Sequence, residues 1–164
     1  PTELPLRSLN KLYPMRYHHL SFSEAVNLEM IHDRMVFTGA IDTFDICLPE
    51  FNKWLRRLAK KHLPQWLEEI SLELQLPFNR VSIRSQKTLW GSCSHNKTIN
   101  LTDRLLFFPF EMVRYVLIHE LCHTVYFGHG KRFWQLVKRF DPDYKSHERS
   151  LRDVSSYIPS CFSN

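Results

Sequence analysis

The sequence lacks the features that mark several special classes of protein. It has no run of 18 or more apolar residues, which excludes an ordinary membrane-spanning helix. Its first 19 residues contain no apolar core behind a basic start, so they do not predict a secretory signal. We also find no internal repeat, low-complexity tract or long linker. With 164 residues, 43% of them hydrophobic and 24% charged, the chain is typical of one globular domain.

Cysteine pairs of the CxxC type are also missing. The four cysteines stand far apart, at positions 47, 93, 122 and 161. A chain of this length does not need a disulfide scaffold to bury a core. We therefore expect reduced thiols, a cytoplasmic location and no association with a membrane.

The excess of positive charge is small. Lys and Arg number 22 and Asp and Glu number 17, and many of the basic residues fall within 54–62 and 130–140. They alternate there with apolar residues, as on the solvent-exposed face of an amphipathic helix. Solvated helix faces explain this pattern most simply, and a weak association with nucleic acid is the alternative.

The first half of the chain predicts a small sheet followed by a long helix. Residues 1–24 show scattered proline and no clear period, so we expect an irregular N-terminal arm ahead of one domain over 25–164. Alternating apolar residues predict strands near 26–30 and 35–37, with a third at 44–48. Helical spacing then predicts a helix over about 50–75, kinked or broken near Pro64.

The second half predicts a hairpin followed by helices. Val81 and Ile83 indicate a strand, and residues 88–101 predict a hairpin around a polar turn at 94–97. Pro109 suits the first position of a helix that runs to about Phe127, where Gly128 would stop it. Further helices are expected over 131–140 and about 146–154. This order of elements predicts an α+β fold.

An HExxH motif lies within the helix predicted after Pro109. Side chains four residues apart on a helix lie one above the other, so His119 and His123 can bind one zinc ion. Glu120 would then stand beside the metal and hold a water molecule. Two core histidines and a surface glutamate are the structural alternative.

A catalytic zinc site needs a third protein ligand. His129 lies between two glycines, and a left-handed turn at Gly128 could return it toward the metal. His147, with Glu148 next to it, is the second candidate.

Trp90, Gly91 and Ser92 form a second pattern of interest. Glycine inside a strand marks the close approach of another backbone, so these residues are candidates for binding an extended peptide. A tryptophan packed in the core, with a glycine relieving a bulge, explains the pattern equally well.

Two segments of the sequence, 80–101 and 114–152, resemble the YgjP-like zinc metallopeptidase family and, more distantly, SprT-like proteases. The segments WGSCS, HELCH and HGKRFW occur in the family's order and spacing. The resemblance implies a small zincin with His119, His123 and His129 as ligands of one Zn²⁺ per chain and Glu120 as general base. We expect its N-terminal sheet to be antiparallel and to pack against the HExxH helix.

The predicted function is hydrolysis of peptide bonds in a polypeptide substrate by a zinc-activated water, with Glu120 as the base. Tyr144 and His147 are candidates for stabilising the transition state. Two alternatives remain at this stage. One is a metal-dependent hydrolase of a nucleotide or another phosphoester. The other is a nonenzymatic zinc-containing module that binds protein or nucleic acid.

Overall fold

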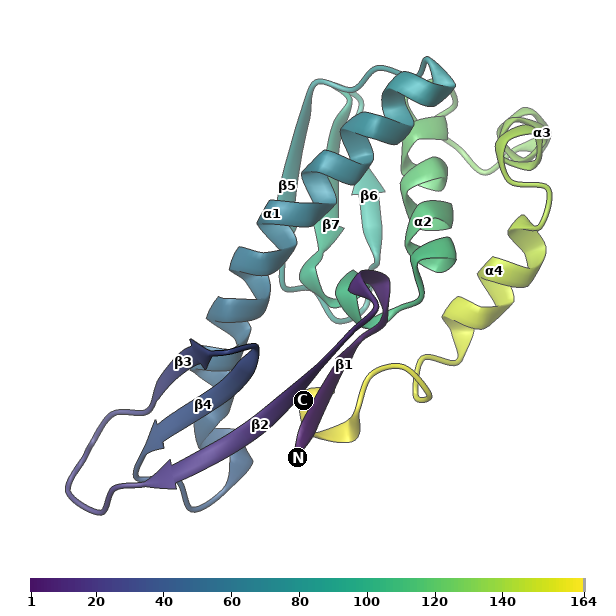
Figure 1. Ribbon diagram of the computed structural model, residues 1–164. Helices are drawn as coiled ribbons and strands as arrows, with labels where there is room; N and C mark the ends of the chain where they lie inside the picture. The colour runs from purple at the N-terminus through teal and green to yellow at the C-terminus, as the bar shows by residue number, and fades with distance from the viewer. Residues whose placement is uncertain (164) are drawn as a thin grey trace.

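A computed structural model describes residues 1–163, in which two small sheets lie along one long helix (Figure 1). The first sheet has the strand order β1 (Glu3–Leu6), β2 (Lys11–His19), β4 (Arg34–Gly39), β3 (Asn27–Ile31). The second sheet has the order β5 (Arg80–Arg84), β7 (Thr98–Thr102), β6 (Gly91–Cys93). The helices are α1 (Leu48–Leu74), α2 (Phe110–Cys122), α3 (Lys131–Phe140) and α4 (Tyr144–Arg152).

The prediction of an irregular arm over residues 1–24 is wrong. Residues 3–19 hold two strands, and β1 pairs antiparallel with β2. Alternate apolar side chains of these strands, among them Leu4, Leu6 and Met15, are buried in the core. The scattered prolines hid this period of two, although an edge strand such as β1 tolerates proline.

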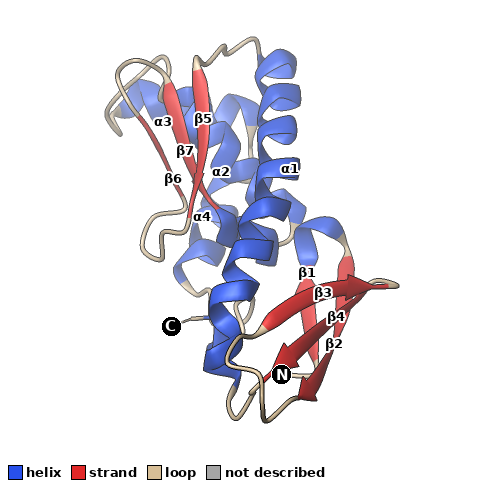
Figure 2. Cartoon of the chain, turned by 90° about the vertical axis from the view of Figure 1, so that its left-hand side faces the viewer, coloured by secondary structure: helices blue, strands red, loops and turns tan. Residues whose placement is uncertain are grey.

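The α+β class is confirmed, but two details of the expected sheet differ. Strands β2 and β4 run parallel, because β3, which comes between them in the sequence, runs in the opposite direction. The HExxH helix α2 lies beside β6 of the second sheet rather than against the N-terminal sheet (Figure 2). The second sheet is therefore the one that positions the site.

Helix α1 begins earlier than the sequence predicts and continues through Pro64. The strand predicted over 44–48 is wrong, since residues 44–47 form a 3₁₀ turn that leads directly into α1. Pro49 suits the first turn of a helix, where its missing N–H is not needed. Tertiary packing along the buried stripe holds the helix together past Pro64 despite the lost backbone donor.

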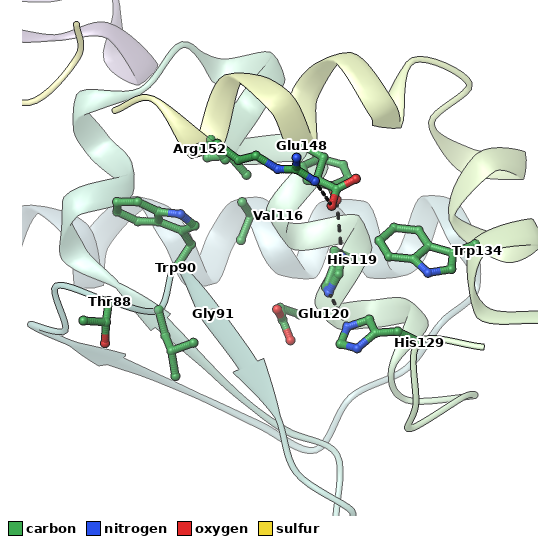
Figure 3. A pocket seen from close by; sticks show the side chains of 13 residues that line it. Thr88, Trp90, Gly91, Val116, His119, Glu120, His129, Trp134, Glu148 and Arg152 are labelled. Carbon is green, nitrogen blue, oxygen red and sulfur yellow. Dashed lines mark hydrogen bonds and ion pairs between the residues drawn. The ribbon is translucent and has the colours of Figure 1, made fainter. Parts of the chain in front are cut away.

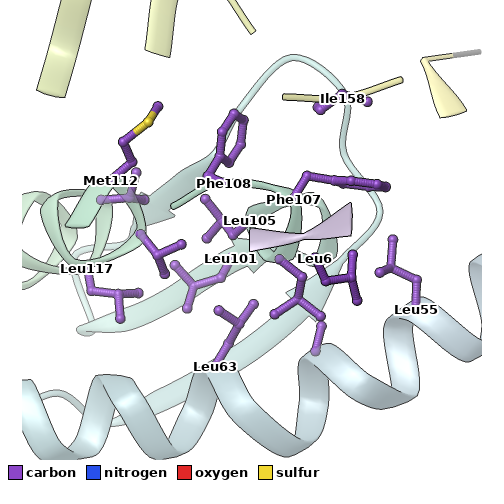
Figure 4. Close-up of a cluster of buried hydrophobic side chains, with 14 of the residues drawn as sticks. Leu6, Leu55, Leu63, Leu101, Leu105, Phe107, Phe108, Met112, Leu117 and Ile158 are labelled. Atoms are coloured by element: carbon purple, nitrogen blue, oxygen red, sulfur yellow. The ribbon is translucent and has the colours of Figure 1, made fainter. Parts of the chain in front are cut away.

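The core lies where α1, α2, β7 and the 3₁₀ turn at 103–107 meet (Figure 4). Leu63 and Leu101 are almost completely buried in it. The far end of the chain completes this core. Phe162 packs on Phe51 at a ring distance of 4.3 Å, and its carbonyl accepts a hydrogen bond from Arg104.

The predicted hairpin is present, with β6 and β7 joined by a turn at 94–97. Helix α2 ends at Cys122, five residues before the predicted end. The chain then turns through 123–126, so that Gly128 lies well beyond the helix end. No helix in the described part of the chain is both long enough and apolar enough to span a membrane.

Candidate active site

A cleft of about 490 Å³ opens between α4 and residues 88–91 at the start of β6, and α2 forms its floor (Figure 3). Residues 88–91 are called the strand side of the cleft below. Its strand wall includes Trp90 and Gly91, and its floor includes His119 and Glu120. The remaining lining residues are Thr88, Leu89, Tyr115, Val116, His129, Trp134, Glu148, Leu151 and Arg152.

Three histidine side chains converge at this cleft. The Nε2 atom of His123 lies 3.2 Å from that of His119 and 3.1 Å from that of His129. The Nε2 atoms of His119 and His129 are 3.3 Å apart. Within residues 1–163, this is the one group of three or more His, Cys, Asp or Glu side chains whose ligand atoms are close enough to hold a metal ion.

The end of α2 explains how the third histidine reaches the other two. His123 caps the helix, and its Nδ1 atom lies 2.9 Å from the carbonyl of Tyr126 in the turn that follows. A proton on Nδ1 donates to that carbonyl and leaves the Nε2 lone pair free, facing the other rings. The loop 123–130 then carries His129 back over the helix end.

Burial and the neighbouring imidazoles favour the neutral form of His119 and His123. Burial, together with His123 and His129, lowers the pKa of His119 to about 3. Burial also lowers the pKa of His123, although the Tyr126 carbonyl acts in the opposite direction. Neutral imidazole is the form that binds a metal ion.

Glu120 is buried beside the three histidines, only 5% exposed. Burial raises the pKa of Glu120 to about 8, and its Oε2 atom has no hydrogen-bond partner among the described residues. A buried polar atom without a partner calls for an explanation, and a nearby cation and a water molecule would provide one.

Gly91 gives the Glu120 side chain its space. A Cβ atom at position 91 would lie 2.9 Å from Cγ of Glu120 and 3.2 Å from its Oε1. The sequence pattern indicated that another backbone approaches this glycine. The group that approaches it inside the protein is instead the Glu120 side chain.

Only some of the other predicted site residues line the cleft. The Trp90 side chain lines the cleft, whereas the hydroxyl of Ser92 accepts a hydrogen bond from the Asn100 amide within the sheet. Tyr144 stacks on Trp134, with ring centroids 5.4 Å apart. His147 does not line the cleft, and its Nδ1 atom lies 2.7 Å from Asp141.

Sequence reasoning missed Tyr115 as a site residue. Its hydroxyl lies 3.5 Å from Nδ1 of His119, on the side of that ring away from the other histidines. The signal was its position four residues before His119 on the same helix face. Phe133 stacks on His123 at 4.2 Å and is almost completely buried, so it supports the site from behind.

A family model matches most of the chain. The YgjP-like metallopeptidase domain matches residues 19–154 of the chain. The chain belongs to the YgjP-like metallopeptidase family. This family membership confirms the expected resemblance and the enzyme class, a zinc metallopeptidase. It also disfavours a nonenzymatic binding module and a phosphoester hydrolase.

Solved structures similar to this YgjP-like chain include two metallopeptidase zymogens. The zymogen of abylysin from Pyrococcus abyssi is 29% identical and covers 54% of this chain and 90% of its own, with a TM-score of 0.48. The zymogen of jannalysin from Methanocaldococcus jannaschii is 23% identical and covers 58% and 96%, with the same TM-score. No curated protein matches the chain.

Proposed function

We propose that this protein hydrolyses peptide bonds in polypeptide substrates, with one zinc ion held by His119, His123 and His129 and with Glu120 as the base. The observation that carries the proposal is the convergence of three imidazole nitrogens beside the buried Glu120 side chain, at the floor of an open cleft.

The three nitrogen positions fit zinc. Tetrahedral ligands at about 2.0 to 2.1 Å from one ion are separated by about 3.3 Å. The three Nε2 atoms are separated by 3.1 to 3.3 Å. With the Nε2 atom of each ring unprotonated, as metal binding requires, three lone pairs would face one another at these distances. A cation at this point resolves that conflict.

A bound zinc ion supplies Lewis-acid chemistry, which acidifies water and polarises a carbonyl group. The chain's own residues supply the proton transfers. Glu120 takes the proton from the attacking water and later passes it to the leaving amine. Its burial keeps bulk water away from that side chain, and the absence of a Cβ atom at Gly91 leaves the space that the side chain occupies.

The strand wall of the cleft is suited to an extended substrate. β6 pairs with β7 on one side only, so its other edge is free to bond a peptide backbone. Trp90 and Gly91 would contact the substrate here, and Ser92 would contribute through its backbone. Tyr144 is better placed than His147 to meet the developing oxyanion, because it lines the hollow beside the cleft and His147 lines neither. The Tyr115 hydroxyl, beside Nδ1 of His119, would instead orient that ring.

Removal and return of the metal test this function. Purified protein should contain about one zinc per chain and should cleave an unfolded protein such as reduced casein. A chelator should abolish cleavage, and added zinc should restore it. Zinc-loaded protein with no activity on any unfolded polypeptide or peptide mixture would contradict the proposal.

Gly91→Val should lower kcat by roughly 100-fold, because an added side chain must displace Glu120, and a shift of about 1 Å in a catalytic group costs that much. Cleavage of a short peptide and of a long polypeptide should fall by similar factors. The matched control is Gly130→Ala, since a Cβ atom there meets nothing within 4 Å. If Gly91→Val changes KM only for long substrates, the glycine serves the substrate and not Glu120.

Two further expectations concern location and nucleic acid. The four free cysteines agree with a cytoplasmic protein, which stays a prediction. A shallow hollow on α1 is lined by several basic side chains, namely Lys53, Arg56, Arg57 and Lys60. Weak, salt-sensitive binding of nucleic acid to this helix also stays a prediction.

A further inference from the structure

Helix α4 forms the wall of the cleft opposite the strand side, and it runs along the length of the cleft (Figure 3). Three of its residues line the cleft directly: Glu148, Leu151 and Arg152. Basic residues follow the same helix at positions 145, 149 and 152, a spacing that places them in one row. This row, Lys145, Arg149 and Arg152, is called the α4 basic row below.

The basic row lines the cleft at Arg152 and lines a neighbouring hollow with all three of its residues. A second hollow, of about 550 Å³, is lined by Lys145 and Arg149 together with Trp134, Tyr144, Glu148 and Arg152. Trp134, Glu148 and Arg152 line both hollows, so the second hollow adjoins the cleft. A chain bound at the three histidines can therefore extend past α4 into the second hollow.

The charges of the row are largely uncompensated. Arg152 forms an ion pair with Glu148 at 3.4 Å. Within the described residues, Lys145 and Arg149 have no carboxylate within 4.0 Å. Asp143 also lies near the row, just before α4, and forms no ion pair with it among those residues.

The opposite wall offers no competing charge. The lining residues on the strand side are Thr88, Leu89, Trp90 and Gly91, all uncharged. Glu120, on the floor, is buried and belongs to the catalytic group. A negative group carried along the cleft would therefore find its only unpaired charged partners, among the described lining residues, on α4.

The row also matches the length of a peptide. Seven residues of helix separate Lys145 from Arg152, which corresponds to about 10 Å at 1.5 Å per residue. An extended peptide covers that distance in about three residues, at roughly 3.3 Å each. Acidic side chains within one short segment can therefore meet the whole row at once.

We propose that the α4 basic row selects polypeptide substrates that carry acidic side chains in the segment lying along α4. The inference rests on the proposed peptidase function and specifies its substrate class. Trp134 and Tyr144 form the apolar floor of this subsite, where the stems of Glu or Asp side chains would lie.

The test uses matched peptide mixtures that are identical except for one fixed position, which holds Glu, Gln or Lys. The fixed position is moved through the three residues on each side of the cleaved bond, and all C-termini are amidated. At one or more positions, Glu should raise kcat/KM roughly 10-fold over Lys, with Gln between them. Added salt should shrink this ratio. A further set of Gln peptides with free C-termini shows whether a C-terminal carboxylate can bind to the row in place of an acidic side chain.

The decisive variant is Lys145→Glu combined with Arg149→Glu, which should invert the preference so that Lys peptides are cleaved best. The matched control is Arg57→Glu combined with Lys60→Glu, the same change of charge on the exposed face of α1. The control should keep the preference of the unmodified protein.

Binding is measured separately from cleavage, with fluorescent versions of the same peptides and the zinc-loaded Glu120→Gln protein. Tighter binding of Glu peptides, lost in the α4 double variant, supports the inference even if turnover is slow. Equal treatment of Glu, Gln and Lys peptides by an active enzyme overturns it and leaves the proposed function intact. If the α4 changes abolish oligonucleotide binding without altering peptide preference, the row serves nucleic acid and the inference is wrong. Absence of any cleavage contradicts the proposed function itself.

Discussion

Replacement of Glu120 with glutamine should lower turnover by roughly 10²- to 10⁴-fold, the usual contribution of a positioned acid or base. Glutamine has nearly the same size and fits the space beside Gly91, but it cannot take a proton. The zinc content should not change, because Glu120 is not one of the converging ligands. Steady-state cleavage of one peptide, with elemental analysis of the same samples, measures both quantities.

Thermal unfolding provides the control for Glu120→Gln. The carboxylate is buried, with one oxygen unpartnered, so its neutral replacement should unfold at the same temperature or higher. A loss of activity that accompanies a lower melting temperature would indicate damage to the fold. Undiminished hydrolysis would remove Glu120 from the mechanism.

Replacement of His129 with alanine should weaken zinc binding by more than about 100-fold. Removal of a group that only supports a metal ligand already costs roughly 10- to 100-fold in affinity. Loss of the ligand itself leaves two protein nitrogens in place of three. Competition with a chromogenic chelator measures the affinity, and hydrolysis should fall with zinc occupancy.

His147→Ala is the matched control, since His147 bonds to Asp141 and lies outside the group of three histidines. It should retain zinc close to the affinity of the unmodified protein. Tight zinc in His129→Ala, or its loss in His147→Ala, would transfer the third position to His147 or Glu148.

The local sequence was sufficient to identify the three histidines as candidate metal ligands. Two of them follow from the four-residue spacing on a helix, and His129 from its place between two glycines. The left-handed turn expected at Gly128 is wrong, because Gly39 is the only glycine with a positive φ among the described residues. Helix α2 ends at Cys122, and a turn closed by the Tyr126 carbonyl, with no sequence signature of its own, redirects the chain.

The partners of the site were harder to predict because they come from remote segments. Gly91 indicated a close approach, but only the packing of β6 on α2 shows that Glu120 occupies the space. The role of α4 as a wall depends on the turn at 141–143, which the sequence marked only as the end of a helix. Such contacts arise from tertiary packing and not from local preference.

The N-terminal strands show the opposite error, in which a local signal was misread. Prolines at positions 5 and 14 concealed an alternation that buries Leu4, Leu6 and Met15. Pro5 lies in the edge strand β1, and at Pro14 strand β2 pairs with β1 alone, because its pairing with β4 begins at Met15. A strand tolerates proline where no neighbouring strand needs its N–H.

The contacts between the two ends of the described chain affect how fast the protein folds. Arg7 donates to the carbonyl of Tyr157 across a sequence separation of 150 residues, and Phe162 packs on rings from the first third of the chain. Contacts of such long range slow a folding reaction, because a large loop must close before they form. We therefore expect this part of the core to close in a slow step. Until that step is complete, exposed apolar side chains make the chain prone to aggregation.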